Sequence, residues 1–192
     1  MKQNMRKRTP LAVLLALCLA MQLCVPAAMA SNRLMRAGDA AIAQIEEEEG
    51  FRAEKYSSGG KWYIGYGTEC GAEDYPEGIT REEAELLLMS KVEAYEAKLN
   101  DFFGRYDVTP TQGQFDALIC FSYNFGTGWM SGTSDLVKIA RGEKDATRLE
   151  VAHAFGEWCH SGGQAQAGLA DRRLQEAAIY LDDGTRAAEN EF

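Results

Sequence analysis

Helical patterning dominates this chain and gives way in one place to a short segment rich in glycine and aromatic residues. Residues 39–48 and most of residues 80–181 carry apolar side chains at helical spacing. Residues 51–68 combine glycine, aromatic and β-branched residues around a turn-forming stretch at 57–60, a pattern typical of a β-hairpin or small meander. The sequence therefore predicts an α+β fold, mostly helical, with a small N-terminal hairpin or meander beside a helical lobe.

The predicted helices carry start and stop signals. The helix from Asp39 to Glu48 has small and apolar residues along one side and is ended by Gly50. Thr80 and Thr111 each stand three residues before a Glu or Gln, the spacing of a capping box. They predict helices over about 81–103 and 111–123. Further helices are expected at Leu136–Ile139, Thr147–Trp158 and Leu169–Leu181.

The first thirty residues have the three parts of an export signal. Lys2 and the basic run Arg6 to Arg8 precede an apolar stretch from 11 to 25, and Ala28-Met29-Ala30 offers a small-x-small cleavage site. The apolar stretch is short for crossing a bilayer. We therefore expect residues 1–30 to be a signal peptide cleaved near Ala30, which leaves a secreted or extracytoplasmic protein without a stable membrane anchor. An uncleaved anchor, or a weakly apolar one that later releases, is the alternative.

Residues 31–192 are expected to form one acidic domain, with a core at about 39–182 and a polar C-terminal tail. Removing residues 1–30 leaves 16 of the 20 basic residues and all 29 acidic ones, a formal charge of −13. This charge argues against nucleic acid or anionic lipid as a partner. We expect a monomer.

Three cysteines remain after the signal segment is removed. Cys120 lies in an apolar run and is expected to be a buried, inert thiol. Cys70 and Cys159 are then the natural candidates for a disulfide, although three pairings are possible and all three thiols could be free. None of them has metal-ligand spacing with His153 or His160, so no metal site is predicted.

A series of motifs starts where the first helix ends. Its members are Glu49-Gly50-Phe51-Arg52, Tyr56, Trp62-x-Ile64-Gly65-Tyr66-Gly67-Thr68, Thr111–Leu118, Phe121–Trp129, and Trp158 with Gly168–Arg173. Together they cover roughly residues 39–182 and, in the same order, resemble the phage-type lysozymes, glycoside hydrolase family 24. The resemblance implies a lysozyme-like fold.

The resemblance also implies an activity. A member of this family would be a muramidase that hydrolyses the β-1,4 bonds between N-acetylmuramic acid and N-acetylglucosamine, with peptidoglycan glycan strands as partner and no metal or organic cofactor. Two other classes stay open: a catalytically weak or inactive glycan-binding protein on the same scaffold, and a structural or inhibitory secreted protein.

The family's catalytic trio is matched at one position of three. Glycoside hydrolysis needs a carboxylic acid beside the leaving oxygen, and a helix end facing a glycine-rich sheet is a suitable place to hold one. Glu49 matches the family's acid there. The resemblance puts Ser58 where the family has an aspartate and Tyr63 where it has a threonine or serine. Both departures fall on residues that would handle the attacking water.

Three explanations of these departures remain open. Water could be held by Ser58, Tyr63 or the backbone of Gly59-Gly60, or another carboxylate could act as the second one. The candidates for that carboxylate are Glu54, Glu69 and Asp74. In the third explanation the protein is a feeble relative that still binds glycan.

Three further residues are candidates for contact with substrate. Tyr66 could stack on a sugar, or it could be a packing residue of the small sheet. By resemblance, Asn124 would hydrogen-bond the glycan from the far side of the cleft. Arg172 or Arg173 would pair with Glu49; spacing does not distinguish them, and Arg172 is our candidate site residue.

Overall fold

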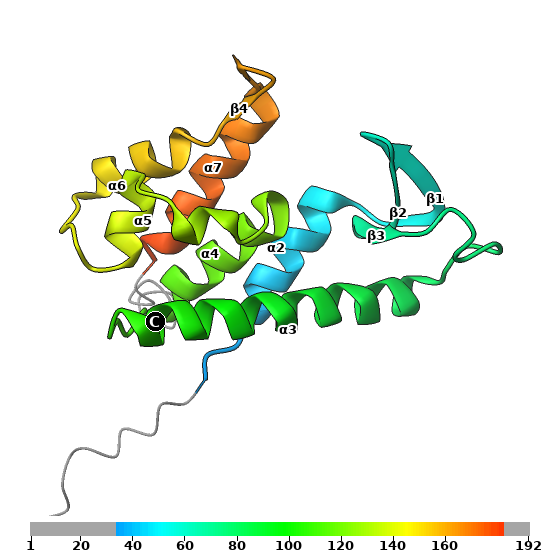
Figure 1. Cartoon of the computed structure of the whole chain (residues 1–192), viewed down its shortest axis with the longest axis horizontal. Coiled ribbons are helices and arrows are strands. Elements are labelled where there is room, and N and C mark those ends of the chain that lie inside the picture. Colours follow the sequence, from blue (N-terminus) through cyan, green and yellow to red (C-terminus); the bar gives the residue numbers. More distant parts are fainter. Residues whose placement is uncertain (1–33, 183–192) are drawn as a thin grey trace, which may run out of the picture. The chain divides into compact units, whose positions relative to one another are not determined.

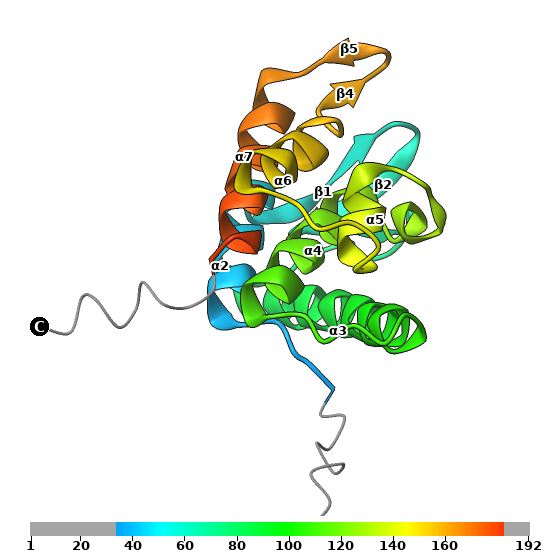
Figure 2. The same cartoon turned by 90° about the vertical axis from the view of Figure 1, so that its left-hand side faces the viewer.

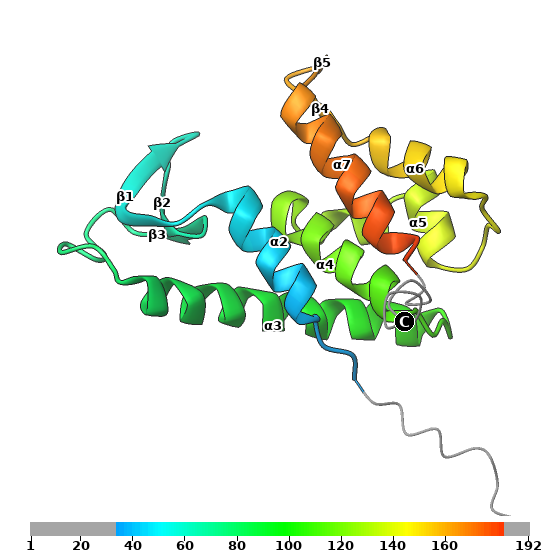
Figure 3. The same ribbon diagram turned by 180° about the vertical axis from the view of Figure 1, so that it is seen from behind.

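Helix α4 (Gln112–Phe125) forms the centre of the structure. The computed structural model describes residues 34–182, and every residue of α4 from Phe115 to Tyr123 is buried. A helix buried on all sides must be covered by its neighbours. Helices α2 (Asp39–Glu49), α3 (Arg81–Arg105) and α7 (Ala167–Tyr180) provide that cover, as Figures 1 and 3 show.

The remaining elements complete an α+β fold that matches the predicted class. They are β1 (Arg52–Ser58), β2 (Lys61–Gly65), β3 (Thr68–Cys70), the short 3-10 helix η1 (Gly128–Ser131), α5 (Asp135–Ala140), α6 (Arg148–Gly156), β4 (His160–Ser161) and β5 (Gln164–Ala165). Helix α3 runs along the sheet at one end and along α4 at the other (Figure 1). It therefore joins the sheet to the helical lobe.

Both predicted capping boxes are present. The Thr80 hydroxyl accepts from the backbone N–H of Glu83 at 3.2 Å, and the Glu83 carboxylate accepts from the backbone N–H of Thr80 at 2.8 Å. Thr111 and Gln114 make the equivalent pair at the start of α4. Each box satisfies two N–H groups that would otherwise lack a helical partner, which fixes where the helix begins.

The small sheet is an antiparallel meander in the order β1-β2-β3. Gly59 and Gly60 form the β1–β2 turn with φ values of 57° and 79°. Because both turn residues are glycines, they adopt the positive φ values that a two-residue hairpin turn requires. The turn is therefore shorter than the predicted 57–60 segment, and β1 continues through Ser58.

A second hairpin, β4–β5, was not predicted. It pairs His160 with Ala165 and Ser161 with Gln164 around Gly162 and Gly163, and it projects beyond α7 in Figure 2. The two-glycine turn was the available signal, but strands of two residues are too short to show alternation.

All three cysteines of the described residues are free thiols. Cys120 is buried as predicted, and burial raises the pKa of its thiol to about 12. The candidate bond between Cys70 and Cys159 is absent, and the alternative in which all three thiols are free describes this structure. Cys70 lies in β3, whereas Cys159 directly precedes β4 in the helical lobe, and these elements are well separated in Figure 1. A disulfide requires the two Cα atoms to be within about 7 Å.

The predicted signal peptide, residues 1–30, and the tail beyond Asp182 lie outside the described residues. Within residues 34–182, no helix has the length and apolar character needed to cross a bilayer.

Candidate active site

Glu49 is the last residue of α2, at the point where the helices meet the sheet. Gly50 follows with a φ of 66°, a left-handed conformation that ends the helix and directs the chain into β1. The Glu49 side chain is 21% exposed. The carboxylate is thus partly sheltered by the protein and still open to a ligand.

Arg172 from α7 is the ionic partner of Glu49. Its Nη1 donates to Glu49 Oε1 at 2.8 Å, and the arginine side chain is only 7% exposed. Arg173 points elsewhere, with its guanidinium over the rings of Phe121 and Phe125. Of the two arginines that spacing could not separate, the structure pairs Arg172 with Glu49.

Glu176, one turn further along α7, connects the two arginines. Its Oε1 accepts from Arg173 Nη2 at 2.7 Å and from Arg172 Nε at 3.4 Å. Arg173 Nη2 also donates to Asn124 Oδ1 at 3.3 Å. Burial raises the pKa of Glu176 to about 7, although both guanidinium groups act to lower it. A continuous chain of polar contacts therefore runs from Glu49 to Asn124.

Gly67 brings the turn between β2 and β3 against Glu49. Its φ is 73°, and a Cβ added there would lie 3.1 Å from Glu49 Oε2 and 4.0 Å from the Tyr56 hydroxyl. Only glycine combines this φ with so close an approach. The backbone of the sheet thus forms one wall around the Glu49 carboxylate.

A cleft of about 690 Å³ begins at this wall. Its lining includes Tyr63, Thr68 and Glu69 from the sheet, Lys91 and Tyr95 from α3, and Tyr123 and Asn124 from α4. The volume lies in the range of small-molecule pockets, roughly 300–1,000 Å³. Aromatic rings with a few polar groups suit a sugar, which has apolar faces and hydroxyl edges.

Lys91 is a partly buried cation within the cleft. Its Nζ lies 3.4 Å from the carbonyl oxygen of Gly67 and 3.8 Å from the centre of the Tyr123 ring. Burial lowers the pKa of Lys91, and the negative charge of Glu49 partly opposes that effect. With Lys61, Lys91 and Glu69 in its lining, the cleft has more basic than acidic side chains, although the chain as a whole is acidic.

Tyr63 and Ser58 differ in their placement. Tyr63 lines the cleft and stacks on Tyr56, with ring centres 5.7 Å apart. Ser58 is exposed at the end of β1, paired with Lys61. The sequence placed Ser58 in the turn-forming stretch at 57–60, but strand pairing continues through Ser58 up to the glycine turn.

Tyr66 packs in the core and Asn124 faces the cleft. Tyr66 is 1% exposed, its hydroxyl accepts from Arg81 Nη1 at 2.7 Å, and its carbonyl oxygen accepts from the Tyr123 hydroxyl at 2.7 Å. A ring held in this way cannot stack on a glycan, so the packing alternative describes Tyr66. Asn124 is exposed at the far side of the cleft from the sheet.

Two residues of the site were missed in the sequence. Lys91 stands four residues after Leu87 and four before Tyr95, inside the apolar stripe of α3. Glu176 stands four residues before Tyr180, on the buried face of α7. A charged residue on an apolar helical face was the available signal in both cases, because it must find a partner or a ligand.

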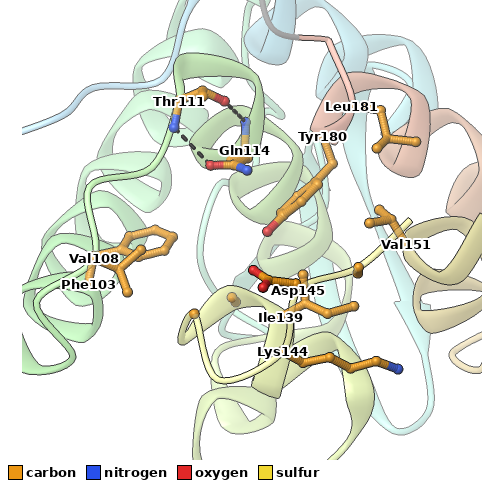
Figure 4. Close-up of a pocket in the computed structure, with 13 residues that line it drawn as sticks. Phe103, Val108, Thr111, Gln114, Ile139, Lys144, Asp145, Val151, Tyr180 and Leu181 are labelled. Carbon is orange, nitrogen blue, oxygen red and sulfur yellow. Dashed lines mark hydrogen bonds between the residues drawn. The ribbon is translucent and has the colours of Figure 1, made fainter. Parts of the chain in front are cut away.

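A separate pocket of about 360 Å³ lies in the helical lobe between the C-terminal end of α3 and helices α4 to α7. Figure 4 shows Lys144, Asp145 and Tyr180 around it and the Thr111–Gln114 capping box at its rim. None of the predicted site residues lines this pocket, so it is not the candidate site. Among residues 34–182, no group of three or more His, Cys, Asp or Glu is placed to hold a metal ion.

Comparison with known sequences identifies relatives. The family model for phage lysozyme matches residues 46–176. The endolysin of Bacillus phage B103 is 34% identical over 151 residues, which are 77% of this chain and 54% of the relative. The endolysin of Bacillus phage PZA is 36% identical over 150 residues, 76% of this chain and 55% of the relative. This chain thus spans about half the length of these curated relatives.

Solved structures agree with that comparison. The endolysin from Escherichia coli O157:H7 phage FAHEc1 superposes with a TM-score of 0.64 at 32% identity, covering 77% of this chain and 94% of that chain. The muramidase domain of SpmX from Asticaccaulis excentricus gives a TM-score of 0.61 at 28% identity, covering 76% of this chain and 97% of that chain.

Proposed function

The chain belongs to the phage lysozyme family, and from that premise we propose that it is a muramidase acting on peptidoglycan. The bond cleaved would be the β-1,4 linkage between N-acetylmuramic acid and N-acetylglucosamine. Glu49 would act as the general acid that protonates the leaving oxygen. Neither a metal nor an organic cofactor is required for such a reaction.

The observation that carries this proposal is the contact between Glu49 and Arg172, beside Gly67, which lines the cleft. A long arginine side chain that is itself buried holds the Glu49 carboxyl in one position. Gly67 lies beside Glu49 Oε2, with too little room between them for a larger side chain at position 67. A general acid must lie within hydrogen-bonding distance of the leaving oxygen of the substrate. Arg172 and Gly67 limit the positions that the Glu49 carboxyl can take, as this role requires.

The remaining walls of the cleft support a glycan as the ligand. Tyr63 and Tyr95 present aromatic surface, and Asn124 presents an amide across from the sheet. In this proposal Arg172 positions Glu49, whereas Asn124 contacts substrate. Tyr66 makes no contact with substrate in this proposal, because its side chain is buried.

We also propose that the protein acts outside the cytoplasmic membrane. Residues 1–30 have the pattern of a cleavable export signal, and a peptidoglycan substrate lies outside the cytoplasmic membrane. The exported product would be a monomer that begins at Ser31. N-terminal sequencing of the protein recovered outside the membrane tests this directly.

One observation favours a second candidate function, a glycan-binding protein without catalysis. Position 58 is a serine, so the site has no carboxylate where the family resemblance would put the second one. A protein with this change but with an intact cleft would still bind glycan strands.

Product analysis decides between these functions. The purified full chain is incubated with purified peptidoglycan, and borohydride converts the new reducing ends to alditols. Mass spectrometry then identifies which sugar carries each alditol. The muramidase proposal predicts new ends on N-acetylmuramic acid. New ends on N-acetylglucosamine would contradict the bond assignment. Co-sedimentation with peptidoglycan without new ends would favour the second function.

A further inference from the structure

The proposed reaction lacks an assigned group to activate water. An inverting glycosidase places two carboxyl groups about 6.5–9.5 Å apart, with the attacking water beside the second. Position 58, where the family resemblance would put that second carboxylate, is a serine. The neighbouring segments offer Glu54, Glu69 and Asp74 as replacements.

The contacts of Asp74 and the location of Glu54 take both away from the cleft. Asp74 Oδ2 accepts the backbone N–H of Gly71 at 2.7 Å, inside the loop that follows β3. Glu54 is exposed on β1 and does not line the cleft. Glu69 is the candidate of the three whose side chain lines it.

Strand register puts Glu69 in one row with Tyr63 and Tyr56, at the opposite end of the row from Tyr56. Tyr63 on β2 pairs with Tyr56 on one side and with Glu69 on the other. Directly paired residues of an antiparallel sheet point to the same face. The three side chains therefore form one row across the sheet, and the Tyr56 end of the row approaches Glu49.

The short chain between Gly67 and Glu69 keeps the backbone of Glu69 near the residue that Glu49 approaches. Two residues span at most about 7 Å between Cα atoms. Glu49 Oε2 lies beside Gly67, and Gly67 and Glu69 both line the cleft. Tyr56 and Glu69 are two strand spacings apart, or about 10 Å between Cα atoms, a separation similar to the one that an inverting site requires. Both carboxylates also interact electrostatically with the same cation, Lys91.

We infer that Glu69 is the general base of this site, an assignment that rests on the proposed muramidase function. Glu69 takes a proton from water while the water oxygen bonds to the anomeric carbon. The glycosidic C–O bond breaks, and its oxygen takes the proton of Glu49. Lys61, whose Nζ lies 2.7 Å from Glu69 Oε2, positions the base. Exchange with solvent then deprotonates Glu69 and reprotonates Glu49.

The test compares removal of the Glu69 carboxylate with removal of its ion pair to Lys61. Glu69→Gln is expected to lower kcat by about 10²–10⁴-fold with little change in KM, as for loss of a general base. Lys61→Gln removes the same ion pair and keeps the carboxylate, so its kcat should fall less. Glu54→Gln, an exposed carboxylate of the same sheet, should match the wild type. Circular dichroism checks that each variant is folded.

Chemical rescue separates a base from a binding or structural residue. In Glu69→Ala, azide can attack the anomeric carbon without a base, while the leaving oxygen still takes its proton from Glu49. Azide should therefore restore bond cleavage and yield a glycosyl azide. No rescue together with a raised KM would overturn the assignment and make Glu69 a binding residue.

The outcomes also separate this inference from the proposed function. An active wild type, an inactive Glu49→Gln and a fully active Glu69→Gln would overturn the role of Glu69 alone. An inactive wild type would overturn both. A slow Glu69→Gln with azide-rescued Glu69→Ala would support both.

Discussion

Arg172 Nη1 donates to Glu49 Oε1 across 2.8 Å, which joins the end of the first described helix to the last one. The same guanidinium contacts Glu176, so a single buried side chain holds two carboxylates. The geometry of the candidate acid is therefore set by α7, more than a hundred residues further along the chain.

Arg172→Gln is predicted to lower both activity and stability. The substitution leaves Glu176 with one arginine and Glu49 with none, and breaking a buried ion pair costs about 3–5 kcal/mol. Because Glu49 is 21% exposed, the free energy of unfolding should fall toward the lower end of that range. Urea denaturation measures it. Arg148→Gln, an exposed arginine of α6, is the matched control. Equal stability of Arg172→Gln and the wild type would show that the pair contributes nothing.

The stability of the protein should depend on the titration of Glu176. Burial raises the pKa of Glu176 from 4.5 to about 7 in the folded state. A group whose folded pKa is raised stabilises the fold fully below its unfolded pKa and loses that contribution as pH rises through its folded pKa. The free energy of unfolding should therefore fall between about pH 4.5 and 7 relative to Glu176→Gln, which cannot titrate. A pH-independent difference between the two proteins would contradict the shift.

The sequence predicted the helices well because their signals are local. Capping boxes at Thr80 and Thr111 fixed two helix starts, and Gly50 fixed a helix end. Helix α3 runs to Arg105, slightly beyond the expected end, because Gly104 stays helical and the first left-handed residue after it is Asp107, with a φ of 54°.

The site was less predictable because its geometry depends on contacts between distant segments. Arg172 and Arg173 are adjacent in sequence, and only the packing of α7 decides which one faces Glu49. Tyr66 is consistent with either a packing or a stacking role until its hydroxyl is seen to bond Arg81. Such choices depend on tertiary structure rather than on local pattern.

Ser58→Asp combined with Tyr63→Thr tests whether the native site is merely weakened. If Glu69 is the base, the double variant should be slower than the wild type. An aspartate at 58 would face Lys61 across the strands and compete with Glu69 for its ammonium group. Loss of the Tyr63 ring would also remove the stack on Tyr56. Initial rates of reducing-end release measure this. A faster double variant would mean that the native site has no second carboxylate.

The three thiols should differ in reactivity. Cys70 and Cys159 are partly exposed and free, whereas Cys120 is buried. Alkylation of the native protein by iodoacetamide should label the first two, and Cys120 should react only in denaturant. Mass spectrometry of the digest locates the labels. Recovery of a Cys70–Cys159 peptide without reduction would contradict the structure.

The central claim is that Glu49 supplies the proton to the leaving group, and the most direct test is kcat for Glu49→Gln on purified peptidoglycan. Glutamine keeps the size of the side chain and can still accept from Arg172, but it cannot donate an acidic proton. The account predicts a fall in kcat of about 10²–10⁴-fold, with retained binding to peptidoglycan and with unchanged activity in the control Glu47→Gln, an exposed carboxylate of the same helix. Wild-type turnover by Glu49→Gln would contradict the account.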